Sequence, residues 1–170
     1  AIDSAAARYL VIHEFAHAMA GLADEYYIPV ADGPAYRGHV EPWQPNVAIA
    51  PDRVKWSNLL AEPPRPTPWN KTEYDRRFAA YVQRYNSLRE AGAEEAVIEK
   101  LMQEEGARQA TLLARNRNPR RPGCFEGANG YARGMFRSGV DCIMFSLQTE
   151  YFCPACSVAI ERVIDEHSLP

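Results

Sequence analysis

The 170-residue chain has no apolar run long enough to cross a bilayer, which excludes a membrane-spanning helix. It also lacks an excess of charge of either sign. Its formal net charge of −3 gives no electrostatic reason to bind nucleic acid or an anionic membrane. No initiator methionine and no signal peptide precede the first motif, so we expect the chain to be the C-terminal part of a longer protein. The composition is that of a globular piece with a modest core.

The segment that says most about function lies near the start. His13 and His17 are four residues apart and Glu14 stands between them, in the pattern H-E-x-x-H. On an α-helix both imidazoles lie on one face, so two nitrogens can reach one zinc ion. Glu14 then lies where its carboxylate can reach a zinc-bound water. Two hydrogen-bonded core histidines are the ordinary alternative, but the constellation favours a zinc site.

The helix expected over residues 1–21 is apolar on almost every side, which predicts that it is buried. Gly21 is expected to end it. Asp24 and Glu25 follow just past the bend. A carboxylate at that place can complete a three-ligand site and leave the fourth position open to water.

The rest of the chain divides into four segments. Residues 22–70 are rich in proline and predict irregular coil, in which Trp43, Trp56 and Trp69 are anchors. Residues 71–118 show helical periodicity with a break at Ala91-Gly92, and predict an antiparallel helical hairpin capped by Thr72. This hairpin is either a lid or docking arm, or a solvated decoration. Residues 119–152 predict loops, and residues 153–170 an amphipathic C-terminal helix.

Six sequence pieces run in order along almost the whole chain: H-E-x-x-H-x-x-x-G-L-x-D-E-Y (13–26), V-K-W (54–56), F-E-G-A-x-G-Y (125–131), G-x-F-R (134–137), D-C-x-M (141–144) and F-C-P-x-C (152–156). Together they resemble the IgA-peptidase-type metallopeptidases, a secreted bacterial family. The Cys-Ile-Met of residues 142–144 resembles the tight Met-turn that lies under the zinc in adamalysin-like metzincins; the alternative is that Met144 is ordinary core filler.

The resemblance implies an α+β fold, mostly α and irregular coil. It corresponds to the C-terminal half of a metzincin-like zinc peptidase domain with the upstream sheet missing. With that sheet missing, the 170-residue chain alone is expected to expose an apolar patch around the N-terminal helix and to be unstable or prone to associate. Residues 71–118 do not match the family and are expected to be an insertion. The resemblance also implies a zinc endopeptidase of extracellular proteins or glycoproteins, located outside the cytoplasm: secreted, periplasmic or at the cell surface. A surface binding module on a non-catalytic peptidase core is the second hypothesis.

The resemblance assigns zinc binding to His13 and His17 and the general base to Glu14. Asp24 is the preferred third ligand, while Glu25 and His39 remain alternatives. The glycine-rich residues 126–131 are expected to form a tight turn that brings Tyr131, and with it Glu126, toward the site. There the Tyr131 hydroxyl could stabilise an oxyanion; a core or rim tyrosine is the equal alternative.

The four cysteines are Cys124, Cys142, Cys153 and Cys156. The C-P-A-C pair at a helix start could be a redox pair, but no βαβ unit precedes it. It could also form a structural zinc site with Cys142 and Cys124. In a secreted enzyme disulfides are the simpler account, and a bridge from Cys142 to Cys153 or Cys156 would tie the Met-turn to the C-terminal helix.

Overall fold

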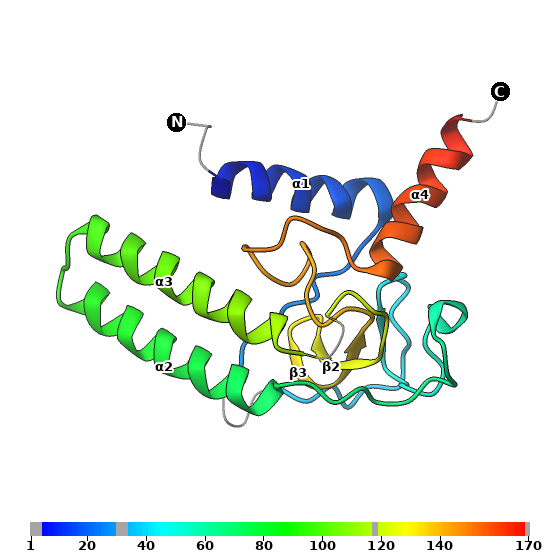
Figure 1. Ribbon diagram of the computed structural model, residues 1–170, viewed down its shortest axis with the longest axis horizontal. Coiled ribbons are helices and arrows are strands. Elements are labelled where there is room, and N and C mark those ends of the chain that lie inside the picture. Colours follow the sequence, from blue (N-terminus) through cyan, green and yellow to red (C-terminus); the bar gives the residue numbers. More distant parts are fainter. Residues whose placement is uncertain (1–4, 30–33, 117–118, 169–170) are drawn as a thin grey trace.

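The computed structural model describes residues 5–29, 34–116 and 119–168 (Figure 1). The elements are helices α1 (Ala5–Ala20), α2 (Lys71–Glu90), α3 (Glu95–Ala114) and α4 (Pro154–Ser168), strands β1 (Val47–Ala48), β2 (Phe125–Ala128) and β3 (Tyr131–Arg137), and a 3₁₀ turn (Ser57–Leu59). The predicted fold class is confirmed: the described chain is α+β and consists mostly of helix and coil.

The elements surround a small central region of sheet and loop. In Figure 1, α2 and α3 lie side by side and form an arm that extends away from the sheet. Helix α1 runs along another side, and α4 begins next to the end of α1 and then points away. None of the described helices is both long and apolar enough to cross a membrane.

The sheet has three antiparallel strands in the order β1-β3-β2. Strands β2 and β3 form a hairpin in which Ala128 pairs with Tyr131. The two residues between them, Asn129 and Gly130, have φ angles of 51° and 80°, as a two-residue type I′ turn requires. This strand pair lies within the stretch expected to be loops, so that expectation was wrong for residues 125–137.

Helix α1 is buried on one side only, and the apolar patch expected around it is exposed. His13 and Ala16 are buried on the side that faces the rest of the molecule. Four large apolar side chains on α1 are instead exposed: Leu10, Val11, Ile12 and Phe15. Helix α1 contacts the rest of the described chain along one side, through the loop after β3, the segment from Leu22 to Tyr26, and α4.

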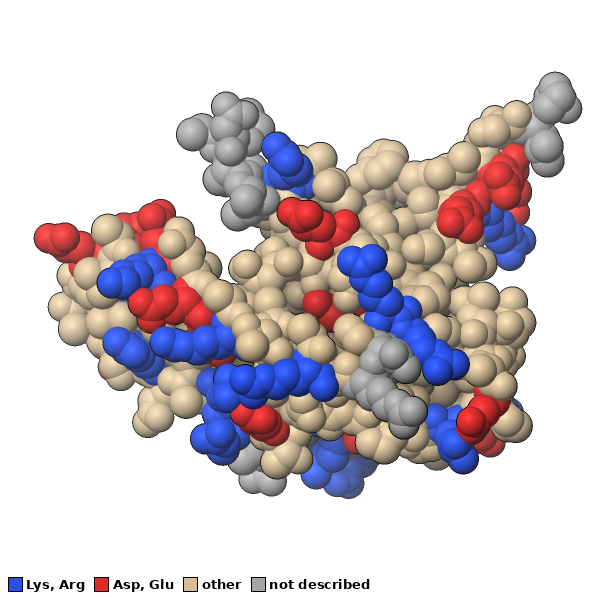
Figure 2. Space-filling view, in the orientation of Figure 1, with Lys and Arg blue, Asp and Glu red and all other residues tan. Residues whose placement is uncertain are grey.

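Helices α2 and α3 form the arm, and Gly92, with a φ of 65°, lies between them. Helix α2 begins at Lys71 with Asn70 as its N-cap residue. Thr72, which was expected to cap it, therefore lies in its first turn. The second helix was expected to run from about Ala93 to Arg115, and α3 ends at Ala114. Asn118, which with Pro119 was expected to stop it, lies outside the described residues. Lys, Arg, Asp and Glu side chains mingle over the arm in Figure 2.

The proline-rich segment is mostly irregular coil, apart from β1 and the 3₁₀ turn. Two of its tryptophans are anchored by their indole N–H groups. Trp56 donates to the Gly123 carbonyl over 2.7 Å, and Trp69 donates to the Glu126 carbonyl over 3.1 Å. Trp43 is 76% exposed, so it is not an anchor of the kind expected.

The main core lies between α1, the arm, the hairpin and the start of α4. Its buried members include Ala16, Leu22, Tyr27, Tyr74, Leu112, Leu113, Phe125, Val140, Met144 and Phe145. Arg137 is fully buried beside it, with its guanidinium 3.8 Å from the ring centroid of Phe145. The guanidinium donates to the carbonyls of Gly127 and Val140, so β3 is tied to the loop that follows it.

Candidate metal centre

The candidate metal centre is organised by the end of α1. The helix places His13 and His17 one turn apart, and the Gly21 N–H donates to the His17 carbonyl over 3.0 Å. Gly21 has a φ of 60°, and a Cβ there would lie 2.6 Å from the Trp43 ring. Glycine meets both conditions, so the chain reverses tightly and brings Asp24 back to the histidines.

Three potential ligand atoms converge at this reversal. Asp24 Oδ1 lies 3.0 Å from His13 Nε2 and 3.1 Å from His17 Nε2, and the two Nε2 atoms are 3.1 Å apart. A tetrahedral zinc ion bound at about 2.0–2.1 Å keeps its nitrogen and oxygen ligands about 3.3 Å apart. The three atoms therefore have nearly the spacing of one face of such a tetrahedron.

The other nitrogen of each imidazole explains why a cation suits this group. His13 Nδ1 lies 3.1 Å from the Ile143 carbonyl and His17 Nδ1 lies 2.6 Å from the Leu22 carbonyl. A carbonyl only accepts, so these contacts are made by the tautomer that carries its proton on Nδ1 and presents a lone pair at Nε2. The Tyr9 hydroxyl donates to the same Ile143 carbonyl over 2.7 Å and lies 3.1 Å from His13 Nδ1. Two lone pairs facing each other repel unless a cation lies between them. The donor set and its orientation therefore fit a metal ion.

One side of this group is open. The His13 side chain is 6% exposed, whereas those of His17 and Asp24 are 28% and 32% exposed. A fourth ligand such as water, or a substrate carbonyl, can reach the ion from that side. A separate groove, lined mainly by residues 59–68 and 121–125, includes none of the three ligand residues.

The segment with the Met-turn pattern packs under the ligand helix. The N–H groups of Phe145 and Ser146 both donate to the Cys142 carbonyl, which makes the turn tight. Met144 is fully buried, and its carbonyl accepts from the Glu25 N–H over 2.7 Å. With the Ile143 carbonyl on His13, this turn holds both the helix and the segment after it.

Glu14 and Tyr26 are exposed residues next to the ligands, and the charge of Glu14 acts on the Tyr26 phenol. Glu14 is exposed on α1, next in sequence to His13. The Tyr26 ring stacks on the His13 ring, with the two ring centroids 6.3 Å apart. Burial, and then a hydrogen bond to Asp24, raise the pKa of the Tyr26 phenol. Sequence reasoning assigned Tyr26 no role; its signal is its place two residues after Asp24.

The turn expected within residues 126–131 reaches the segment after α1, because the Asn129 and Gly130 N–H groups donate to the Asp24 and Tyr26 carbonyls over 2.9 and 3.0 Å. The described side-chain contacts of Tyr131 and Glu126 are with other groups. Tyr131 packs edge to face on Tyr36, with ring centroids 5.2 Å apart. The Glu126 carboxylate accepts from the Gly134 N–H within the hairpin. Of the alternative third ligands, His39 is exposed and Glu25 is fully buried, and neither belongs to the converging group.

The predicted disulfide is not formed. All four cysteines are free, and the Sγ atoms of Cys142 and Cys156 are 3.8 Å apart, whereas a disulfide bond is about 2.05 Å long. The predicted proximity of these cysteines was right, because Cys142, Cys153 and Cys156 do lie together. They gather around Glu25 instead of pairing with each other.

Comparison with known proteins supplies the family. No curated protein matches the chain. A protein-family model described as IgA Peptidase M64 matches residues 1–164, which is almost the whole chain and includes every residue of the candidate centre. Because the match covers far more than half of the sequence, the chain belongs to the IgA peptidase M64 family.

Proposed function

We propose that this chain carries the zinc ligands and the general base of an endopeptidase. The observation that carries the proposal is the convergence of His13 Nε2, His17 Nε2 and Asp24 Oδ1, with Glu14 adjacent, in a chain of a peptidase family. Membership of that family supports hydrolysis of protein substrates. The metal, the base and the endopeptidase mode are the parts that we add.

The donor set selects the ion. Two imidazole nitrogens and one carboxylate oxygen, with a fourth position open, form the arrangement of catalytic zinc sites. A zinc ion bound there supplies Lewis acidity, which lowers the pKa of a coordinated water and polarises the scissile carbonyl. The carbonyls of Leu22 and Ile143 orient the two histidines for this role.

The protein side chains then move the proton. Glu14 is exposed and next in sequence to His13, which supports its role as the base: its carboxylate would accept a proton from the attacking water and return it to the leaving amine. The Tyr26 phenol, whose pKa burial and the Asp24 carboxylate raise, is the group placed to orient that carboxylate. Stabilisation of the oxyanion by Tyr131 stays a prediction, since the described contacts of its ring are with Tyr36.

The substrates that we propose are extracellular proteins or glycoproteins, which matches the expectation that the protein acts outside the cytoplasm. The open face of the centre supports a macromolecular substrate, because His17 and Asp24 are reached from the surface. A buried small-molecule cavity would instead enclose the ligand on most sides.

The test is the Glu14→Gln variant of the complete protein, with Glu99→Gln as control, because Glu99 is an exposed glutamate on α3. Zinc content should stay at the wild-type level, since the ligands remain. Turnover of a general protein substrate should fall by about 10²–10⁴-fold or more, as when a general base is lost. Near-normal turnover would remove Glu14 from the mechanism. Zinc-loaded wild-type protein without turnover would favour the non-catalytic binding module.

A further inference from the structure

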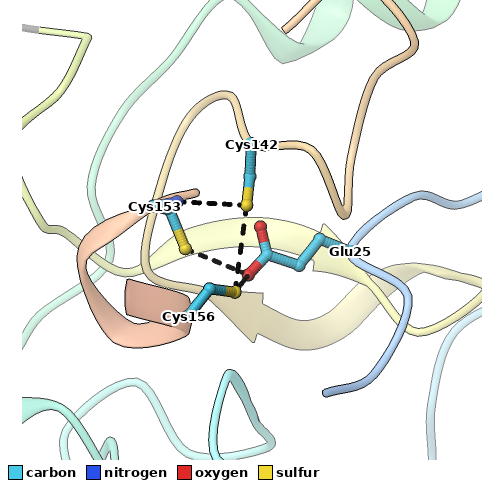
Figure 3. A group of neighbouring side chains, drawn as sticks. All are labelled: Glu25, Cys142, Cys153 and Cys156. Carbon is cyan, nitrogen blue, oxygen red and sulfur yellow. Dashed lines mark hydrogen bonds between the residues drawn. The ribbon is translucent and has the colours of Figure 1, made fainter. Parts of the chain in front are cut away.

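A second group of potential metal ligands lies inside the molecule, next to the first centre. It consists of Glu25, Cys142, Cys153 and Cys156 (Figure 3). Glu25 follows the bend after α1, Cys142 belongs to the Met-turn, and the two other cysteines stand at the start of α4. All four residues are completely buried, with relative exposures of 0%.

The distances are those of ligands around an ion. Cys142 Sγ and Cys156 Sγ are 3.8 Å apart, and the Sγ atoms of Cys153 and Cys156 each lie 3.2 Å from Glu25 Oε1. All four ligand atoms lie within 4.8 Å of one another. A tetrahedral zinc with sulfur at about 2.3 Å and oxygen at about 2.0 Å spaces its ligand atoms by about 3.5–3.8 Å.

The hydrogen bonds around the group leave it incomplete without a cation. Glu25 Oε2 is buried and has no hydrogen-bond partner among the described residues. Besides Asn46, at 3.2 Å, the partners of Oε1 are thiols, which are weak donors. A buried carboxylate held mainly by thiols is unfavourable, since burial of an ionised group needs a charge or strong donors.

Neighbouring groups are arranged to support thiolates. The backbone N–H of Cys153 donates to Cys142 Sγ over 3.1 Å, and the Ser138 hydroxyl lies 3.0 Å from Cys153 Sγ. The buried Arg137 guanidinium interacts electrostatically with Glu25. A dication with three thiolates and one carboxylate keeps a net negative charge, which a buried arginine partly offsets.

The competing readings of these cysteines fit less well. A redox pair needs a thiol that reductants can reach, but Cys153 and Cys156 are both fully buried. The fourth cysteine, Cys124, is not part of the group. It packs in a separate apolar cluster with Val54 and Trp56.

We propose that Glu25, Cys142, Cys153 and Cys156 bind a second zinc ion that is structural. Four protein ligands close the coordination shell, so no position is left for water or substrate. The ion would join three segments that hold the first centre: Asp24 precedes Glu25, Ile143 follows Cys142, and α4 packs against α1. This inference does not depend on peptidase activity.

The experiment is a zinc analysis of three variants of the complete protein, purified without chelator. Wild-type protein should hold about two zinc ions per chain, and the His13→Ala/His17→Ala variant about one. Adding Cys142→Ser to that variant should remove the remaining zinc. Adding Cys124→Ser in its place should leave the zinc bound, because Cys124 is an equally buried cysteine outside the group.

A spectroscopic measurement removes the dependence on how the cysteine variants fold. Cobalt(II) substituted into the His13→Ala/His17→Ala variant should show the strong near-ultraviolet charge-transfer bands of thiolate ligation, and zinc-edge absorption spectroscopy should show mostly sulfur neighbours. After denaturation with a chelator, four thiols should titrate. A metal-free variant with fewer than four titratable thiols would overturn the proposal in favour of a disulfide. A cobalt spectrum without thiolate bands would overturn it as well.

Discussion

At the scale of single residues, the notable feature is that two neighbouring carboxylates serve different groups. Successive side chains of an extended segment point in opposite directions. Asp24 therefore reaches outward to the two imidazoles, while Glu25 reaches inward to the thiols. The backbone N–H of Glu25 is held by the Met144 carbonyl, which keeps this division in place. A rotation of this one segment would disturb both groups together.

The Tyr26 phenol interacts with the Asp24 carboxylate, which adds to burial in raising the pKa of the phenol, and the Tyr26 ring lies over His13. Tyr26→Phe should keep the ring on His13 but release the carboxylate, so zinc affinity at the first centre should fall by about 10–100-fold. Competition with a chromogenic chelator measures this. Tyr131→Phe is the matched control, since the Tyr131 ring packs on Tyr36, and it should leave zinc affinity unchanged. Equal affinities in wild type and Tyr26→Phe would contradict the role given to Tyr26.

The two histidines were predictable from spacing alone, whereas the third ligand was a preference for Asp24 over Glu25 and His39. His13 and His17 share a helix face whatever the rest of the fold does, because four residues make about one turn. The choice of Asp24 over Glu25 depends on the backbone rotation after Gly21, which no local pattern reports. For the same reason, the sequence alone could not show that Glu25 lies among Cys142, Cys153 and Cys156.

At the scale of elements, the tight turn expected within residues 126–131 is found at Asn129-Gly130, but the two strands that it joins were not predicted. Asn-Gly at 129–130 is the usual sequence of a type I′ turn, and its positive φ angles bear this out. The strands were taken for loops because glycine interrupts both. Gly127 is needed where β2 bulges, since a Cβ there would lie 2.3 Å from the Tyr27 ring. Helices with long periodic stripes, such as α2 and α3, were far easier to predict.

The arm formed by α2 and α3 contains one buried acid, Glu105. Burial raises the pKa of this carboxyl, while Arg108 and Arg77 lower it in part. A raised folded-state pKa favours the protonated form, so this group costs stability as the pH rises through that pKa. Glu105→Gln should therefore raise the Tm near neutral pH, and the gain should shrink toward about pH 4.

Thermal unfolding followed by circular dichroism over this pH range checks the prediction for Glu105. Glu99→Gln is the control, because Glu99 is exposed on the same helix and should change the Tm little. A gain for Glu105→Gln that is independent of pH would show that something other than the buried charge is responsible.

At the scale of the whole molecule, the outward side of α1 is the feature that the fold does not account for. Val11 and Phe15 are 65% and 62% exposed, four residues apart on one helix face. Their apolar neighbours Leu10 and Ile12 are exposed too. Monomeric soluble proteins seldom expose such a contiguous patch, so this side is expected to associate with other apolar surface.

The 170-residue chain should therefore self-associate at micromolar concentration. Val11→Gln together with Phe15→Gln should reduce the association, because glutamine keeps the helix propensity but removes the apolar surface. Analytical ultracentrifugation measures it. Val158→Gln is the control, since Val158 is 44% exposed on α4. A wild-type chain that sediments as a monomer at all concentrations would contradict this account.

The central claim is that His13, His17 and Asp24 bind zinc, and anomalous diffraction at the zinc edge tests it most directly. Crystals of the complete protein should show a peak about 2.0–2.2 Å from His13 Nε2, His17 Nε2 and Asp24 Oδ1. The second proposal adds a separate peak among Glu25 and the three cysteines. Zinc-supplemented crystals without a peak at the histidines, or with the ion on His39 instead of Asp24, would contradict the account of the first centre.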